Sequence, residues 1–256
     1  MKMSELYAEF RCRNGRTVLA DARFTPPLKL AKPFPIEGET GAYVTVMDAS
    51  PGMLDGDRYE LTWRIGDGTR AAATTQSYAK VHPCPRIGVE QKIRITVGEG
   101  ASFIHAPQPM TLYADASFKG STRVELAAGA SLILLDTLGA GRIHYAGGEA
   151  FRYRLYENEL TVLAQGKVAA ANRVRFAPAE QNPFAPGVFE NDTHVGTLYG
   201  FGPFAGRAAV GALLAAAEQQ PNVRTGASLL FRSGLAATVL GRSAWDVQQT
   251  LLARSE

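Results

Sequence analysis

Apolar and polar residues alternate along most of the chain, with the period of two that is typical of β-strands. In residues 6–12, apolar or small side chains alternate with polar ones, and residues 17–24 alternate again. Between these two segments, Asn14-Gly15 favours the two positive φ angles of a type I′ turn. The pattern therefore predicts a β-hairpin at the N-terminus.

The same alternation predicts further strands, separated by glycine-containing turns. Pro26-Pro27 ends the hairpin, because proline cannot donate the backbone hydrogen bond that a strand interior needs. Residues 41–47 alternate as another strand. From residue 58 to about residue 176, short β-branched and aromatic runs predict strands at 59–65, 91–97, 110–114, 122–126, 131–135, 150–157 and 159–164.

A weak internal repeat lies within this β-rich region. Residues 93–104 resemble residues 123–134, with Gly100 and Gly129 at the same place in each copy, and G-A-S-L-L recurs at 226–230. Each copy is interpreted as a strand, a glycine-containing turn and an apolar strand. Such a unit is typical of a β-helix or solenoid-like winding or of two stacked sheets, although shared hairpin chemistry explains it equally well.

Helical patterns occur only in the last quarter of the chain. Residues 204–220 are rich in Ala and Leu and end at Pro221, and their face of Ala, Val210, Leu213 and Leu214 is expected to pack on the sheet. Residues 243–254 have a Ser N-cap and apolar spacing at positions 245, 247, 251 and 252. The predicted fold is a single, mainly β domain over residues 1–256, with a β-helix or solenoid-like winding and two helices in the C-terminal region.

Composition and charge exclude several classes of function. The formal net charge is +3 and no Lys/Arg run reaches five residues, so neither indicates nucleic-acid binding. No apolar stretch of about 18 residues predicts a membrane span. Glu5 and Glu9 interrupt what would be a signal peptide, and the two cysteines form no disulfide framework. These features predict a cytoplasmic protein.

The motifs of known catalytic and metal sites are missing from the sequence. No two of the four histidines have the spacing of a zinc site, and G-x-S-x-G, Walker A and dinucleotide-binding loops do not occur. Asp55 and Asp57 suggest a general acid–base pair. On an Asp-Gly-Asp turn, however, we favour hydrogen bonding within the turn for Asp55, and expect Asp57 to point at a buried partner. The chain is therefore predicted not to be an enzyme.

A second polar group of residues follows the predicted strand at 131–135. Asp136 ends that strand, and Arg142 and Glu149 lie in the connection that follows. One interpretation is an Arg–carboxylate pair that braces two loops. The other is a polar lining inside a β scaffold, because a cation moving through a protein interior needs oxygen ligands that bind it weakly enough to release it.

Several motifs of the chain occur in the order expected of the urease accessory protein UreD (UreH) family. They are G-R-T (15–17), P-P-L-K-L-A-K-P-F (26–34), S-P-G-M-L-D-G-D (50–57), T-T-Q-S-Y-A-K-V (74–81), and G-R followed by G-E-x-F within 141–151. The A-P-x-P segment at 106–109 also fits, and G-A-S-L-L-F-R at 226–232 fits more loosely. The sequence therefore resembles this family over essentially its whole length.

This resemblance implies a role without catalysis. UreD-like proteins are maturation factors that sit on the urease apoprotein, bind UreF and through it recruit UreG, the GTPase that delivers nickel. Nickel would be a transient cargo, and no cofactor would be stably bound. The resemblance also implies an internal nickel passage or a structural polar role for residues at matching motif positions, namely Asp57, Ser77, Lys80, Asp136, Arg142 and Glu149.

Two alternatives stay open on the sequence. The chain would be a β-solenoid module that binds a protein unrelated to nickel, through an exposed Phe/Pro loop around Phe184 to Phe189. Otherwise it would be a hydrolase that uses Asp55 and Asp57, which the missing nucleophile and metal motifs disfavour.

Overall fold

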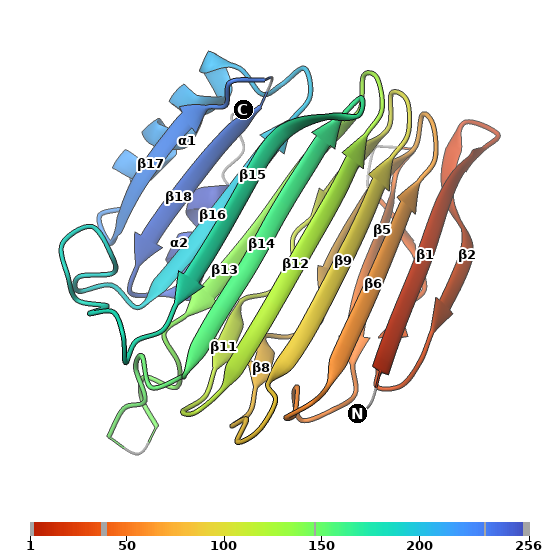
Figure 1. Ribbon diagram of the computed structural model, residues 1–256. Coiled ribbons are helices and arrows are strands. Elements are labelled where there is room, and N and C mark those ends of the chain that lie inside the picture. The colour runs from red at the N-terminus through yellow and green to blue at the C-terminus, as the bar shows by residue number, and fades with distance from the viewer. Residues whose placement is uncertain (1–2, 37–39, 146, 233, 253–256) are drawn as a thin grey trace.

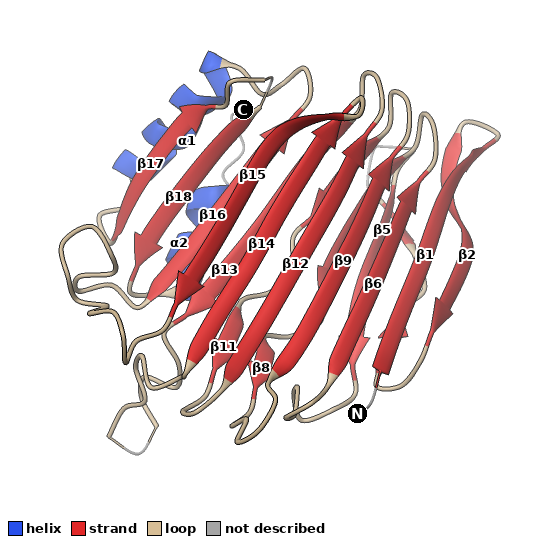
Figure 2. Cartoon of the chain, in the orientation of Figure 1, coloured by secondary structure: helices blue, strands red, loops and turns tan. Residues whose placement is uncertain are grey.

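Two β-sheets lie face to face in the structure, and two α-helices cover part of one of them (Figures 1 and 2). The computed structural model describes residues 3–36, 40–145, 147–232 and 234–252. In spatial order, the first sheet contains β15 (Lys167–Phe176), β14 (Leu155–Ala164), β12 (Ser117–Leu126), β9 (Val89–Val97), β6 (Arg58–Ile65), β1 (Met3–Arg13) and β2 (Arg16–Phe24).

The second sheet faces the first across the hydrophobic core. Its main path contains β17 (Val223–Leu229), β18 (Leu235–Gly241), β16 (His194–Phe201), β13 (Ser131–Gly139), β10 (Ser102–His105), β7 (Arg70–Thr75), β5 (Ala42–Asp48) and β3 (Leu28–Leu30). The short strands β4 (Phe34–Pro35), β8 (Ala79–Val81) and β11 (Met110–Leu112) pair beside this path. The prediction of a mainly β chain with two helices is confirmed.

Parallel neighbours in one sheet are connected through a strand of the other sheet. From β6 to β14 the chain alternates between the sheets, and β6, β9, β12 and β14 pair in parallel, as do β7, β10 and β13. The edges differ, because β2, β15 and the β16–β18–β17 group pair antiparallel. A β-helix or solenoid-like winding of the whole chain is therefore not confirmed.

The internal repeat corresponds to neighbouring strands in register. Ser102 pairs with Ser131, and the turns before these residues contain Gly100 and Gly129, with φ angles of 59° and 66°. The third copy is different, because Gly226 lies inside the edge strand β17 and not in a turn. The interpretation of residues 226–230 as another strand–turn–strand unit is therefore wrong.

The N-terminal hairpin is confirmed, and one predicted strand needs correction. β1 and β2 pair antiparallel, and Asn14 and Gly15 both have positive φ angles, 52° and 73°. The strand predicted at 150–157 begins only at Leu155 and then continues without interruption to Ala164. Residues 150–154 form a connection instead, because Phe151 adopts a φ of 56°, which a strand does not accommodate.

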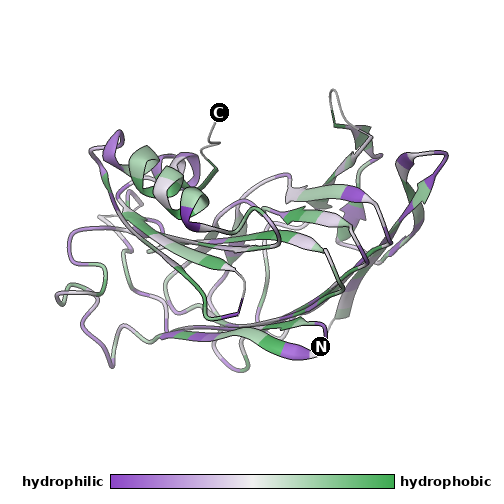
Figure 3. Cartoon of the chain, turned by 90° about the horizontal axis from the view of Figure 1, so that it is seen from above, coloured by the Kyte–Doolittle hydropathy of each residue, from purple (hydrophilic) through white to green (hydrophobic). Residues whose placement is uncertain are grey.

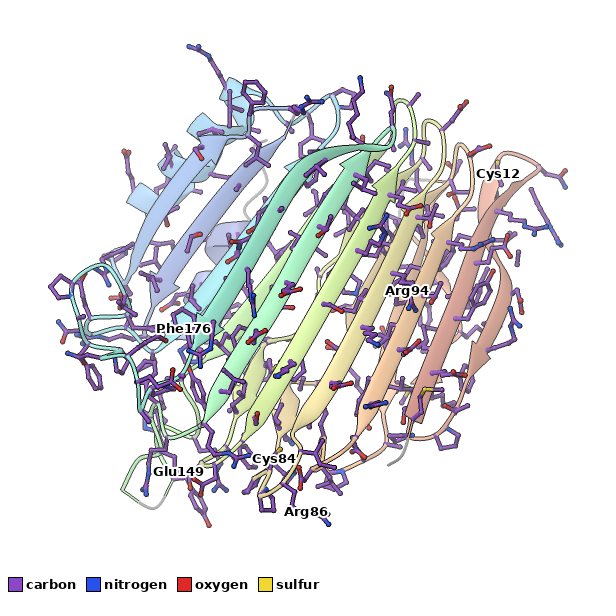
Figure 4. All side chains as sticks on the ribbon, viewed as in Figure 1. Cys12, Cys84, Arg86, Arg94, Glu149 and Phe176 are labelled. Atoms are coloured by element: carbon purple, nitrogen blue, oxygen red, sulfur yellow. The ribbon has the colours of Figure 1, made fainter. Side chains whose placement is uncertain are left out.

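The outer face of the first sheet is polar, whereas its inner face builds the core. Arg94 bonds Glu60 and Arg58 bonds Glu90, both at 3.2 Å, and Figure 4 shows Arg94 on this outer face. Exposed pairs of this kind add little stability, about 0–1 kcal/mol each. These charged side chains allow one side of a largely parallel sheet to face solvent without another layer packed on it.

Both helices lie on the outer side of the second sheet, as the view from above shows (Figure 3). Helix α1 (Arg207–Glu218) buries Leu213, and helix α2 (Ala244–Leu252) buries Val247 and Leu251. At the start of α2, the Ser243 hydroxyl accepts a hydrogen bond from the backbone N–H of Asp246, as an N-cap does.

Three apolar residues of the helices are exposed, and one of them, Leu214, was expected to pack on the sheet. Trp245 is 68% exposed, Leu252 46% and Leu214 37%. The helices touch the sheet along a narrow line, so residues just beside that line stay in solvent although they are apolar. The predicted packing of Leu214 on the sheet is therefore wrong.

Gly196 allows α2 to approach the second sheet. A Cβ atom there would lie 2.5 Å from Val247 Cγ1 and 2.6 Å from Leu251 Cδ1. We expect Gly196→Ala to destabilise the chain by about 1–3 kcal/mol through overpacking, measured as a lower midpoint of thermal unfolding.

Gly211 in α1 provides the matched control. A Cβ atom there meets nothing within 4 Å, so Gly211→Ala should stabilise the chain by about 0.5–1 kcal/mol through helix propensity. If Gly196→Ala unfolded at the same temperature as the unmodified chain, this account of the packing of α2 would be contradicted.

Candidate functional site

A cavity of about 360 Å³ lies between the two sheets. Most of its walls are apolar, with large side chains such as Trp63, Phe118 and Leu134 from both sheets. Polar side chains gather in it at a few places, and these define the candidate site. Volume, apolar walls and a few convergent polar groups are the usual properties of a binding cavity.

Asp136 is the central polar residue of the cavity. It lies inside β13, and its Oδ2 accepts hydrogen bonds from the Tyr156 hydroxyl and the Asn158 amide, both at 2.8 Å. Because Tyr156 and Asn158 belong to β14, these bonds join the two sheets. Burial raises the pKa of the Asp136 carboxyl, and the two hydrogen bonds oppose that shift only in part.

Neighbouring residues leave room for this network. Gly120 of β12 pairs with Asn158 in the first sheet, and a Cβ atom at Gly120 would lie 2.5 Å from the Asn158 side-chain oxygen. A second bridge joins the sheets nearby, where the Asn172 amide donates to the Tyr199 hydroxyl at 2.6 Å. Burial raises the pKa of Tyr199, so the phenol stays protonated at neutral pH.

His105 is a buried polar residue that also lines the cavity. It is only 6% exposed, and among the described residues its Nδ1 has no hydrogen-bond partner. The rings of Trp63 and Phe103 surround it, with centroid distances of 6.0 and 6.1 Å. This burial lowers the pKa of His105 to about 4, so the imidazole is neutral at pH 7.

The motif at 50–57 and the motif at 74–81 lie against each other beside the cavity. Met53 bridges Val81, and the backbone N–H of Met53 donates to the carbonyl of Lys80 at 2.8 Å. Ser77 and Lys80 are exposed and also line the cavity, so they lie at its opening. The structure therefore brings three of the predicted site residues, Ser77, Lys80 and Asp136, to one cavity.

Asp55 bonds a neighbouring loop, whereas Asp57 bonds its own turn. Asp55 accepts backbone hydrogen bonds from Ile87 and Gly88 at 2.8 Å, and these bonds, with the bond to Gly88 first, lower the pKa of its carboxyl. Asp57 Oδ2 accepts the N–H of Leu54 at 2.9 Å. Asp55 thus holds the loop at residues 86–88, so the expectation that it bonds within its own turn is wrong. The expectation that Asp57 points at a buried partner is also wrong, because its carboxylate closes its own turn.

Arg142 and Glu149 form a bidentate ion pair away from the cavity lining. Their two N···O distances are 2.7 and 2.6 Å, and the Arg142 guanidinium stacks between the rings of Tyr113 and Tyr145. Figure 4 shows Glu149 on the loops at one end of the sandwich. This geometry fits the brace between loops that the sequence suggested.

The described residues contain no cluster of three or more His, Cys, Asp or Glu side chains that would hold a metal ion. Within the same residues, no helix is long and apolar enough to span a membrane.

Comparison with known proteins decides the family. The family model described as UreD urease accessory protein matches residues 2–254. The chain belongs to the UreD urease accessory protein family. The recognition from sequence motifs is thus confirmed, and UreD-family membership assigns the chain a role in urease maturation.

Relatives in this family are similar along most of the chain. The urease accessory protein UreD of Acetivibrio thermocellus is 31% identical over 251 residues, which cover 98% of this chain and 95% of the relative. UreD of Actinobacillus pleuropneumoniae serotype 3 is 28% identical, with 94% and 90% covered. UreH of Helicobacter pylori is 29% identical over 181 residues, with 71% and 67% covered.

In this UreD-family chain, the Phe/Pro loop is less exposed than its sequence suggests. Phe184 is 59% exposed, but Phe189 is buried and packs against Phe151 and Phe176, with ring centroids 4.8 and 5.1 Å away. Phe189 is therefore a core residue, and its expected place on a partner surface is wrong.

Tyr156, Asn158 and His105 were not selected from the sequence. Asn158 gave a signal, since a polar amide interrupts an otherwise apolar and charged strand pattern. Its partner Asp136 lies 22 residues earlier and in the other sheet, so only the fold brings them together.

The raised pKa of Asp136 gives a prediction about stability. When a carboxyl group has a higher pKa in the folded than in the unfolded chain, its ionisation favours unfolding. The folded chain therefore loses stability as the pH rises from about 4 toward the folded-state pKa of that group. Asp136→Asn removes this loss and keeps an oxygen acceptor for Tyr156 and Asn158. We expect the variant to unfold at a higher temperature than the unmodified chain at about pH 7, with a smaller difference at about pH 4. Lower stability of the variant at both pH values would contradict the conclusion that burying this carboxylate costs the folded chain stability.

Proposed function

We propose that this chain is a non-catalytic scaffold for urease maturation, which binds the urease apoprotein and UreF and, through UreF, UreG. In this proposal, nickel passes through the cavity between the sheets on its way to the urease active site. The single observation that carries the proposal is a buried carboxylate, Asp136, within an internal cavity of a UreD-family chain.

The chemistry of the cavity suits a cation that stays only briefly. A carboxylate, phenol and amide oxygens offer oxygen ligands, and Asp136 already shares one oxygen with two donors, which limits how tightly it holds a metal. Ser77 and Lys80 at the opening would form the entrance or exit of such a passage. Asp57, Arg142 and Glu149 would keep the surrounding loops in place.

Exposed apolar residues near the C-terminal helices support a role as a scaffold. Trp245 and Leu252 of α2 are 68% and 46% exposed. Apolar groups gathered on a surface are typical of protein–protein interaction sites. We assign this surface to UreF and expect the assembly to form in the cytoplasm.

Co-expression tests the proposal. The urease subunits, UreF, UreG and the other accessory proteins are produced with and without this chain, and the nickel content and activity of the purified urease are measured. We expect both to fall strongly without the chain, because the cargo would lack its route. Omission of UreF serves as the control, since it should give the same loss.

Full nickel loading in the absence of this chain would contradict the proposal. Turnover of a substrate by the isolated chain would contradict its non-catalytic part.

A further inference from the structure

The two helices cover only one half of the outer side of the second sheet (Figures 1 and 3). Helix α1 packs on β17 and β18, and α2 packs on β13, β16 and β18. The outer side of β5 and β7 lies beyond both helices (Figure 3). Half of this sheet therefore presents its outer face to solvent.

A row of side chains crosses this half from strand to strand. Phe34 of β4 pairs in register with Tyr43 of β5, which pairs in turn with Ala72 of β7. From the other side, Ile104 of β10 also pairs with Ala72. The residues before and after Tyr43, Ala72 and Ile104 are buried in the core, so these three side chains point outward. Phe34 is 59% and Ile104 38% exposed. We call these four residues the open face.

The open face differs in chemistry from the outer face of the first sheet. In the first sheet, charged side chains such as Arg94 and Glu60 pair across neighbouring strands. Strands β7, β10 and β13 also pair in parallel, and parallel strands usually have both faces covered. Contiguous apolar side chains on a surface are typical of interaction sites. The first sheet thus suits solvent, whereas the open face suits a further layer.

The open face continues onto one side of α2. The side-chain amide of Gln248 donates to the carbonyl of Pro107, two residues after β10 ends, at 3.5 Å. Trp245 and Leu252 lie three residues before and four residues after Gln248, so they share that side of the helix. Both are exposed. A partner on the open face would therefore contact the sheet below it and apolar side chains of α2 beside it.

The dimensions and side chains of this surface fit an α-helix. Strands lie about 4.8 Å apart and a helix with its side chains is about 10 Å wide, so one helix covers about two strands. Ala72 and Thr74 are short outward residues of β7, and the Thr74 hydroxyl already donates to the carbonyl of Ala106 at 2.6 Å. Neither needs water, and both allow close approach. Helix α2 approaches the same sheet in this way over Gly196.

The far rim of the open face is basic. Lys29 is exposed on β3 between the buried Leu28 and Leu30, and Lys32 is exposed in the connection to β4. Within the described part of the chain, neither lysine has an ion pair or a hydrogen bond. The one carboxylate on β3, β4, β5, β7 and β10 is Asp48, which lines the cavity on the inner side. Acidic residues of a partner would complement this rim.

We propose that the open face, together with Trp245 and Leu252, binds an amphipathic α-helix of UreF whose acidic residues lie next to Lys29 and Lys32. The inference rests on the proposed function, which assigns the exposed side of α2 to UreF. It adds the strands that take part and the kind of element that binds there. The helix lies beside α2 and completes the helical layer on the second sheet.

Titration calorimetry of purified UreF with the complete 256-residue chain tests this surface. Ile104→Glu places a carboxylate in the middle of the open face, and we expect it to raise the Kd for UreF by about tenfold or more. Lys29→Glu should raise the Kd by about threefold and make it less dependent on salt concentration, because one attraction to an acidic residue is lost.

Val168→Glu is the matched control. Val168 is 56% exposed on β15, in the first sheet, so the same kind of change should leave the Kd unaltered. Thermal unfolding of each variant shows that the fold is kept.

Photo-crosslinking identifies the occupant without adding a charge to the open face. The aromatic residue p-benzoylphenylalanine replaces Phe34, and the chain is mixed with purified UreF, UreG and urease apoprotein in equal amounts. We expect a crosslink to a UreF segment that is helical and carries acidic residues. A crosslink to urease, to UreG or to a second copy of the chain in place of UreF would overturn the assignment.

The inference and the proposed function fail by different results. Unchanged UreF binding by a folded Ile104→Glu chain, or an equal loss of binding in Val168→Glu, would overturn the open face alone and leave the co-expression result standing. Failure of the unmodified chain to bind UreF would instead contradict the proposed function itself.

Discussion

The hydrogen bonds from Tyr156 and Asn158 to Asp136 connect two sheets that apolar packing alone would bring together without a gap. A buried carboxylate needs donors, and the donors come from the opposite sheet. The glycine at position 120 and the bridge from Asn172 to Tyr199 belong to the same arrangement. The cavity exists because polar side chains occupy positions where a β-sandwich would otherwise place interlocking apolar ones.

Burying the Asp136 carboxylate costs free energy of folding, and the apolar packing around the cavity offsets that cost. Parallel strands that alternate between the sheets bury a long series of large side chains, among them Trp63, Phe103 and Leu132. The turns at the ends of the strands are fixed by carboxylates such as Asp55 and by the Arg142–Glu149 pair. Polar residues of the motifs thus divide into those that hold the loops and those that face the interior.

The sequence predicted local structure well where one residue type decides the geometry. Asn14-Gly15 indicated the hairpin, and Pro221 indicated the end of the first helix. Prediction from the sequence failed where tertiary packing decides the secondary structure. Strand β7 is an example, because it consists of small and polar residues, A-A-A-T-T after Arg70, that carry no strand pattern of their own. Leu214 misled for the opposite reason, since this residue of the predicted apolar helix face is exposed.

The candidate site was predictable only in part. Asp136 stood out as a carboxylate after an apolar run, although β13 continues past it to Gly139. Its partners Tyr156 and Asn158 and its neighbour His105 come together through strand register, which a single sequence does not reveal. The resemblance of the motifs indicated the family, but it did not separate the residues of the cavity from those that brace the loops.

The passage itself is tested most directly by filling the cavity without removing a ligand. Thr197 of β16 pairs with Asp136 and lines the cavity, so Thr197→Phe would place an aromatic ring there and leave the carboxylate intact. The nickel content of urease matured with this variant is the decisive quantity. Our account predicts a clear loss of nickel while the variant still co-purifies with urease. Urease with its full nickel content, matured by a folded Thr197→Phe chain, would contradict an internal route for the metal.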